Sequence, residues 1–222
     1  MESFKNLDMG RVANVIGGTG FIGQNLVNQL LFHSEFEKVR IFVRRKTRFI
    51  HTNLEEIIID FDQPESWKHL VQGDVLFSIL GTTLKTVRTR KSKYRVGYTN
   101  QYEFARAAAE NGVSTYILVS SVGANSKSLF FYSRMKGKLE EEVARLNFRK
   151  LFILRPSILD GPRSERRLGE KFRLFNSRLL YSLNLKKFRP TPVNVLTSKM
   201  IRLSVGHTEG FRLVEGDEIF SV

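Results

Sequence analysis

The sequence predicts an α/β protein built on a doubly wound parallel sheet, and three observations support this. An apolar, β-branched stretch at residues 12–16 predicts a buried strand, which leads through a glycine-rich turn into a helical pattern at residues 21–31. Further apolar strands alternate with helical segments of crossover length, which implies parallel strands with helices on both faces of the sheet. The 222 residues, of which 41% are hydrophobic, suffice for one domain with a buried core.

The remaining elements follow in the same rhythm. Apolar and β-branched residues predict further strands at residues 38–43, 55–60, 74–80, 115–119 and 150–154. Apolar residues at helical spacing predict crossover helices at residues 64–71, 94–111 and 129–146. The second of these helices is rich in alanine, and Gly112 marks its end.

The alternation breaks at Pro156, and we expect a different organisation beyond it. A basic amphipathic helix is expected at residues 169–184, a further helix at residues 196–205, and one or two short edge strands at residues 211–214 and 218–220. We therefore expect a single domain over residues 1–222, with a core at about 10–155 and a small lid at about 156–222 that covers the carboxyl ends of the strands.

The glycine-rich turn predicts a dinucleotide site, and the sheet is then of the Rossmann type. Gly17 permits a tight turn, Gly20 lets the backbone approach a pyrophosphate, and Gly23 lets the helix pack closely on its strand. Bare N–H groups at the start of the helix face the phosphates. The residues expected to contact the cofactor here are Gly17, Thr19, Gly20, Phe21, Ile22 and Gly23.

The end of the second strand favours NADP(H) over NAD(H). Arg44, Arg45 and Lys46 stand where an acidic residue would bind the ribose of NAD, and residues 38–50 contain no acid. A guanidinium offers a planar fork to a 2′-phosphate. The ends of the third and fourth strands are expected to contact the adenine and the pyrophosphate or second ribose, through Asp60, Phe61, Leu80, Gly81, Thr82 and Thr83.

Tyr132 and Lys136 form the candidate acid/base pair. They lie four residues apart, so a helix places both on one face. The ammonium favours the phenolate, and the phenol can exchange a proton with a carbonyl or alcohol oxygen while hydride moves to or from nicotinamide. Ser120 and Ser121 end the preceding strand, where a hydroxyl can donate to the substrate oxygen.

These motifs resemble the short-chain dehydrogenase/reductase family. The G-x-x-G-x-x-G spacing is that of its extended and atypical branches, and Ser121, Tyr132 and Lys136 match its Ser-Tyr-Lys triad. The family's active hydroxyl commonly stands second in a serine pair, which favours Ser121, while Ser120 is expected to contact the cofactor. The run from Leu154 to Arg163 is similar to a segment of epimerase-like members, which implies cofactor contacts by Arg155, Pro156 and Ser157. The whole pattern is most similar to the Tat-interacting-protein oxidoreductase subgroup.

Composition limits the partners and the compartment. The net charge of +14 favours anionic partners, and basic residues concentrate in segments 85–95 and 163–189, whose alternative role is a solvated surface. The sequence contains no cysteine, so we expect no disulfide and a reducing, cytoplasmic location. The four histidines are scattered, and no metal site, signal peptide or membrane span is expected. Nucleic acid is not an expected partner, because no nucleic-acid-binding motif is present.

Two functions remain open at this point. The first is an NADP(H)-dependent oxidoreductase that acts on a carbonyl or hydroxyl group of a small, anionic substrate. The second is a non-catalytic NADP(H)-binding regulatory or scaffold protein that binds a partner through its basic surface. The complete Ser-Tyr-Lys set favours the enzyme, and both a monomer and a homodimer are compatible with the sequence.

Overall fold

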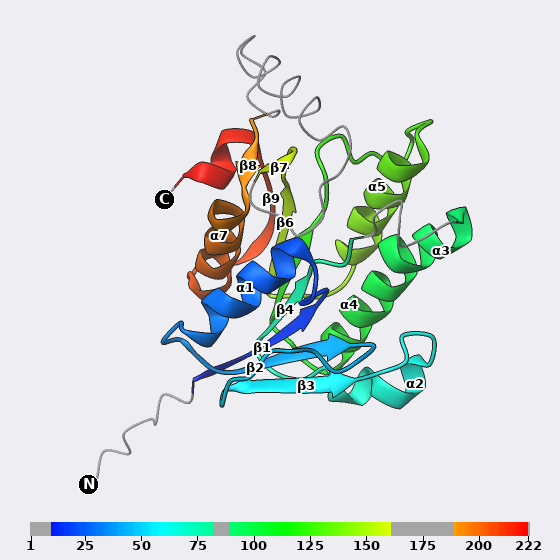
Figure 1. The fold of residues 1–222 in the computed structure, drawn as a ribbon. Coiled ribbons are helices and arrows are strands. Elements are labelled where there is room, and N and C mark those ends of the chain that lie inside the picture. Colours follow the sequence, from blue (N-terminus) through cyan, green and yellow to red (C-terminus); the bar gives the residue numbers. More distant parts are fainter. Residues whose placement is uncertain (1–9, 82–88, 161–188, 222) are drawn as a thin grey trace, which may run out of the picture.

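The computed structural model describes residues 10–81, 89–160 and 189–221. A seven-stranded parallel sheet lies at its centre, in the order β3-β2-β1-β4-β5-β6-β9 (Figure 1). The strands are β1 Arg11–Ile16, β2 Phe36–Val43, β3 Leu54–Ile58, β4 Val75–Ser78, β5 Thr115–Val119, β6 Lys150–Arg155 and β9 Gly210–Glu215. The predicted doubly wound α/β fold is confirmed. The strand order reverses between β1 and β4, and ligands of such sheets bind at the carboxyl ends beside that point.

Helices cover both faces of the sheet (Figure 1). On one face, α1 Phe21–Leu31 and α7 Val193–Val205 pack on a core that includes Val15, Ile41 and Phe77. On the other face lie α2 Pro64–Trp67, α4 Asn100–Glu110 and α5 Phe131–Val143. Buried Trp67 stacks on Phe104 there, with ring centroids 4.0 Å apart. The two layers hold the carboxyl ends of β1, β4 and β5 side by side.

The predicted helix over residues 94–111 is divided into three parts. α3 Arg90–Tyr94 precedes a π-helical turn, η2 Arg95–Thr99, and α4 follows. Gly97 lets this turn pack closely on α5, because a Cβ atom there would lie 2.4 Å from Met135 Cε. The Gln101 amide donates to the Gly97 carbonyl at 2.8 Å, so a side chain satisfies one of the carbonyls of the turn.

The prediction that residues 156–222 form a lid is wrong for residues 189–221, the larger part of this stretch that the structure describes. α7 lies beside α1 on one face of the sheet, and β9 pairs in parallel with β6 as an edge strand, so both belong to the core. The apolar side chains Leu196, Met200 and Val214 are fully buried in that core, which is the physical reason. The expected strand at residues 218–220 is instead a 3₁₀ helix, η4 Gly216–Phe220, which begins at a glycine with a φ of 59°.

Three smaller elements complete the described chain. The predicted crossover helix at residues 64–71 consists of α2 and a short 3₁₀ helix, η1 Lys68–Leu70. β7 Leu159–Asp160 and β8 Thr191–Pro192 form a separate parallel pair. The basic helix expected at residues 169–184 lies outside the described residues.

Candidate functional site

The turn between β1 and α1 has the geometry that its glycines predict. Gly17 adopts a φ of 89°, and a Cβ atom there would lie 2.7 Å from the carbonyl oxygen of Ile79. A Cβ atom on Gly23 would lie 2.1 Å from the carbonyl oxygen of Gly17. The backbone N–H of Gly20 donates to that same oxygen at 3.0 Å. The first glycine is therefore needed for the turn and the third for the close approach of helix and turn.

The start of α1 suits a phosphate. Gly20 is the N-cap residue of α1, so no side chain caps this helix. The first turn of α1 contains no acidic residue. Thr19 and Gly20 are exposed, and Phe21 and Ile22 are half-buried. The backbone N–H groups at the start of a helix and the helix dipole together favour an anion at this end. Residues 17–23 thus fit the pyrophosphate of a dinucleotide.

Three cations follow β2 at the adjacent strand end. Arg44, Arg45 and Lys46 are exposed and form no ion pair within the described part of the chain. The next residue, Thr47, is held by Glu56 on β3, since its hydroxyl donates to the carboxylate and its backbone N–H lies 3.3 Å from both carboxylate oxygens. Glu56 thereby fixes the turn without neutralising the three preceding cations.

The residues expected to contact the adenine and the pyrophosphate or second ribose differ in exposure. The Asp60 carboxylate is exposed and accepts from the backbone N–H of Asp62 at 2.9 Å. Phe61 is half-buried and lies 5.6 Å from the ring of Phe104, so it also packs on the core. Leu80 is half-buried and Gly81 is exposed, while Thr82 and Thr83 lie outside the described residues.

Lys136 is the most buried of the candidate catalytic residues. Its side chain reaches from α5 to the end of β5, where Nζ donates to the Val119 carbonyl at 3.2 Å. Burial lowers the pKa of this ammonium to about 8, and the charge of Glu140 opposes that shift. Tyr132 lies one helical turn before Lys136 and is 51% exposed, so a substrate can reach the phenol.

The two serines differ in accessibility. Ser120 Oγ is buried and has no hydrogen-bond partner among the described residues. Ser121 is half-buried, and its hydroxyl lies 3.4 Å from the carbonyl of Val122. The exposure of Ser121 agrees with its predicted role, which stays a prediction. The structure brings both serines to the same strand end as Lys136.

Backbone hydrogen bonds join the ends of β5 and β6. The N–H of Ser120 donates to the Leu154 carbonyl at 2.8 Å, and the N–H of Val122 donates to the Pro156 carbonyl at 3.2 Å. Pro156 is buried and Ser157 is half-buried. The expected cofactor-binding segment 155–157 therefore lies next to the serine pair.

Arg155 has a structural partner that the sequence did not indicate. Its guanidinium pairs with the buried carboxylate of Glu140 on α5, and a second nitrogen lies 3.6 Å from Glu215 on β9. These contacts raise the pKa of Arg155, chiefly through the hydrogen bond that its guanidinium donates to Glu140. Arg155 thus joins α5 to two strands, and its predicted contact with a cofactor stays a prediction.

Gly137 was also missed, although a glycine inside a predicted helix is a signal of close packing. A Cβ atom there would lie 2.1 Å from the backbone nitrogen of Ser126. The loop that carries the serines therefore packs directly on α5. Leu129 and Phe130 end this loop just before α5, and their apolar side chains are 94% and 78% exposed.

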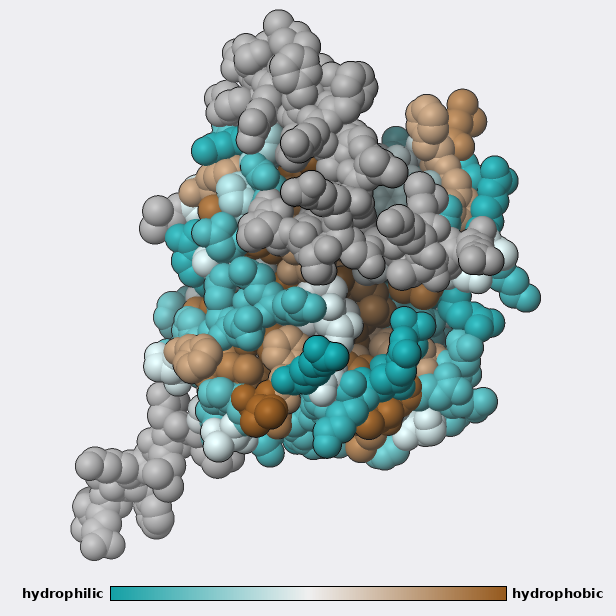
Figure 2. Space-filling view, in the orientation of Figure 1, coloured by the Kyte–Doolittle hydropathy of each residue, from teal (hydrophilic) through white to brown (hydrophobic). Residues whose placement is uncertain are grey.

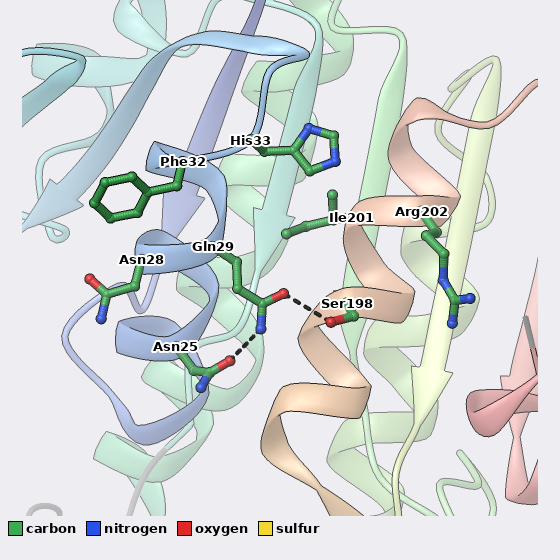
Figure 3. Close-up of a pocket in the computed structure, with 8 residues that line it drawn as sticks. All are labelled: Asn25, Asn28, Gln29, Phe32, His33, Ser198, Ile201 and Arg202. Carbon is green, nitrogen blue, oxygen red and sulfur yellow. Dashed lines mark hydrogen bonds between the residues drawn. The ribbon is translucent and has the colours of Figure 1, made fainter.

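Two grooves lie beside α1, and the second includes Phe21 of the glycine turn. A groove of about 590 Å³ lies along the contact between α1 and α7 and is lined by Asn25, Asn28, Gln29, Phe32, His33, Ser198, Ile201 and Arg202 (Figure 3). A second groove of about 580 Å³ lies between the start of α1 and β8. Within the described ranges, no group of His, Asp or Glu side chains forms a metal site, and no helix is long and apolar enough to cross a membrane.

The comparison with known families agrees with this geometry. The sequence pattern of a family described as NAD(P)H-binding matches residues 17–177. The chain belongs to the NAD(P)H-binding family. The matched segment begins at the first glycine of the turn and includes all the candidate catalytic residues.

Several relatives are proteins named FMP52, mitochondrial. The chain is 34% identical over 169 residues to the protein of Coccidioides immitis, which covers 70% of this chain and 69% of that protein. It is 32% identical over 179 residues to the Saccharomyces cerevisiae protein, and this match covers 79% of this chain and 75% of that protein. The chain thus also belongs with the FMP52 proteins. Their mitochondrial designation contradicts the expected cytoplasmic location, which absence of cysteine alone did not establish.

Solved structures share the fold. A UDP-glucose 4-epimerase of Thermotoga maritima superposes with a TM-score of 0.68 at 15% identity, covering 91% of this chain and 75% of that one. Bordetella bronchiseptica WbmH in complex with NAD⁺ gives 0.67 at 16% identity, with coverage of 92% and 75%. An Agrobacterium tumefaciens short-chain dehydrogenase/reductase superfamily protein with bound NAD gives 0.66 at 15%, with coverage of 92% and 77%. The chain therefore shares the fold of these proteins.

The burial of Lys136 predicts a pH-dependent stability. Because its pKa is lower in the folded protein, about 8 against an ordinary 10.5, the folded state opposes protonation and the protein gains stability as the pH rises from 8 to 10.5. Lys136→Met should remove this gain. The free energy of unfolding of the parent, relative to that of the variant, should therefore rise by about 3 kcal/mol across that pH window. Urea unfolding at pH 7 and pH 10 measures the difference. Exposed Lys138→Met is the control, and an equal pH response in both variants would contradict the prediction.

Proposed function

We propose that this protein is an NADP(H)-dependent oxidoreductase that interconverts a carbonyl and a hydroxyl group. The observation that carries the proposal is the position of Lys136, which is buried against the end of β5 beside the serine pair and one helical turn from the exposed Tyr132. Burial of an ammonium is costly, which favours a role for its charge. The match to the NAD(P)H-binding family and the geometry of the glycine turn support a cofactor site next to these residues.

The residues of the chain perform the proton chemistry in this proposal. Ser121 donates a hydrogen bond to the substrate oxygen, and the Tyr132 phenol gives that oxygen a proton in the direction of reduction. The positive charge of Lys136 stabilises the resulting phenolate. The bound nicotinamide supplies or accepts the hydride. Lys136 would also hold the ribose hydroxyls of the cofactor.

The phosphate-binding residues support a preference for NADP(H). Arg44 and Arg45 are exposed at the end of β2, carry charges that no described acid pairs, and are fixed by the Thr47–Glu56 contact. A 2′-phosphate at this place gains charge-assisted hydrogen bonds that NAD(H) cannot make. We therefore propose that the protein prefers NADP(H) to NAD(H), in addition to binding a cofactor of this kind.

The cofactor preference has a direct test. NADPH should bind about tenfold or more tightly than NADH, a difference of about 1.4 kcal/mol, and the double variant Arg44→Ala, Arg45→Ala should lose most of it. Fluorescence titration of both cofactors gives the four dissociation constants. Arg48→Ala, an exposed cation in the same turn, is the matched control. Equal affinities for the two cofactors in the parent would refute the preference.

The substrate is proposed to be a small anionic molecule with an apolar part. Leu129 and Phe130 give an apolar approach to Tyr132, and exposed Arg90 and Lys91 begin α3. Within the basic segments, Arg95 is engaged by Asp62 at 2.6 Å and Arg189 by Asp217 at 3.3 Å, so these two are less available. Most of segment 163–189 and residues 85–88 lie outside the described residues.

The names of the relatives support a mitochondrial location, which we propose for this protein. Similarity to the Tat-interacting-protein subgroup stays a prediction from the sequence. The non-catalytic alternative shares the cofactor site, and screening aldehydes and ketones for NADPH oxidation separates the two. A parent protein that binds NADPH but turns over no carbonyl would favour the regulatory role.

A further inference from the structure

Thr47 stands in a sequence that basophilic protein kinases select. Arg44 and Arg45 precede it by three and two residues, and Lys46 precedes it directly. No other serine or threonine in the sequence has arginine at both the second and third preceding positions. Kinases of this kind recognise their substrates through such patterns of positive charge.

The structure presents this sequence in an accessible turn. Residues 44–50 connect β2 to β3 outside any helix or strand, and Arg44, Arg45, Lys46 and Arg48 are exposed. In Figure 2, the visible described surface over β2 and β3 mixes hydrophilic residues with apolar patches. Thr47 itself is half-buried, so a kinase must first release its local contacts.

Those local contacts are few and centre on one carboxylate. The Thr47 hydroxyl donates to Glu56, and the same oxygen accepts from the backbone N–H of Phe49 at 3.1 Å. The backbone N–H of Thr47 completes the contact with Glu56 at 3.3 Å. Glu56 therefore holds the turn that presents Arg44 and Arg45, and opening it breaks these hydrogen bonds and the partial packing of Phe49.

We propose that Thr47 is a phosphorylation site at which phosphate weakens the binding of NADP(H). The inference rests on the proposed use of Arg44 and Arg45 for the 2′-phosphate. In the modification, Thr47 Oγ1 forms a bond to the γ-phosphorus of ATP while the bond from that phosphorus to the bridging β,γ oxygen breaks. ADP leaves, and the hydroxyl proton is released.

Electrostatics give the direction of the effect. A phosphothreonine carries about two negative charges and can no longer donate to Glu56, whose carboxylate repels it. Lys46 and Arg48 flank Thr47 in the chain, and Arg44 and Arg45 precede it by three and two residues, so these cations attract the phosphate. The modified side chain then neutralises the cations that a 2′-phosphate needs. NAD(H) has no 2′-phosphate, so its binding should change little.

The experiment treats the full chain with ATP and the catalytic subunit of cyclic-AMP-dependent protein kinase. Intact mass should show one added phosphate on the parent and none on the nearly isosteric Thr47→Val. In the phosphorylated parent, the dissociation constant of NADPH should rise about tenfold or more, while that of NADH changes less than about twofold.

The outcomes separate this inference from the proposed function. No phosphate on the folded parent, equal incorporation in Thr47→Val, or unchanged NADPH affinity after modification would each overturn the inference. The unmodified parent, titrated with both cofactors, tests the proposed NADP preference independently. If the unmodified parent does not prefer NADPH, that preference fails, and the inferred effect on NADPH binding fails with it whatever the mass spectrum shows.

Discussion

Replacing Tyr132 by phenylalanine is expected to lower turnover by about 10²- to 10⁴-fold, the contribution of a positioned general acid or base. The ring remains, so the dissociation constant of NADPH should change by less than about twofold. The reason is local. Tyr132 is the exposed phenol one turn from Lys136, whose buried Nζ reaches the end of β5.

The measurement is NADPH oxidation with the best carbonyl compound found in a screen of aldehydes and ketones, together with a fluorescence titration of NADPH. Tyr102→Phe is the matched control, because Tyr102 belongs to a row of stacked tyrosines on α4 and its neighbours and has no proposed role in the chemistry. Full activity of Tyr132→Phe would refute the acid/base assignment. Equal loss in both variants would indicate damage to the structure instead.

Substituting Gly23 by alanine should strongly lower the stability of the folded protein. The new methyl group would lie 2.1 Å from the Gly17 carbonyl oxygen and 2.7 Å from backbone atoms of Gly18, and none of these is a flexible side chain that can move aside. Helix and turn must separate, at a cost of about 3 kcal/mol by comparison with overpacked cores. Urea unfolding of the parent and the variant measures this cost.

Gly20→Ala is the matched comparison in the same turn. Its methyl group would meet the Gly17 carbonyl oxygen at an ordinary 3.4 Å, and its φ of −79° suits any residue. The variant should therefore unfold within about 0.5 kcal/mol of the parent, as exposed substitutions usually do. Its NADPH affinity should nevertheless fall, because the methyl group stands where the backbone approaches the pyrophosphate. Similar stabilities of the Gly20 and Gly23 variants would show that the turn is not as tight as described.

Local sequence patterns predicted most of the sheet core. The strand at residues 115–119 and the helix at residues 21–31 have the predicted bounds, because apolar periodicity and flanking glycines are local signals. The same holds for the glycine turn, where the conformations of Gly17 and Gly23 follow from their spacing. Boundaries were less accurate where a helix meets another element, as at the π-helical turn around Gly97.

The carboxyl-terminal third shows where local reasoning fails. The sequence predicts a helix at residues 196–205 and an edge strand at residues 211–214, where the structure has α7 and β9. Their place in the core could not be derived from periodicity. Only the burial of Leu196, Met200 and Val214 against the sheet and α1 decides that α7 and β9 complete the fold. Such contacts join residues that are far apart in the sequence.

The sequence by itself determined the chemistry that the site can offer: a glycine turn for phosphates, cations after β2, and a phenol four residues from an ammonium. The tertiary structure decided the state of these groups. It buries Lys136 against the Val119 carbonyl and lowers its pKa, pairs Arg155 with Glu140, and ties Thr47 to Glu56. Spacing along the chain fixes which residues share a helix face, whereas desolvation and charge pairing depend on neighbours that only folding brings together.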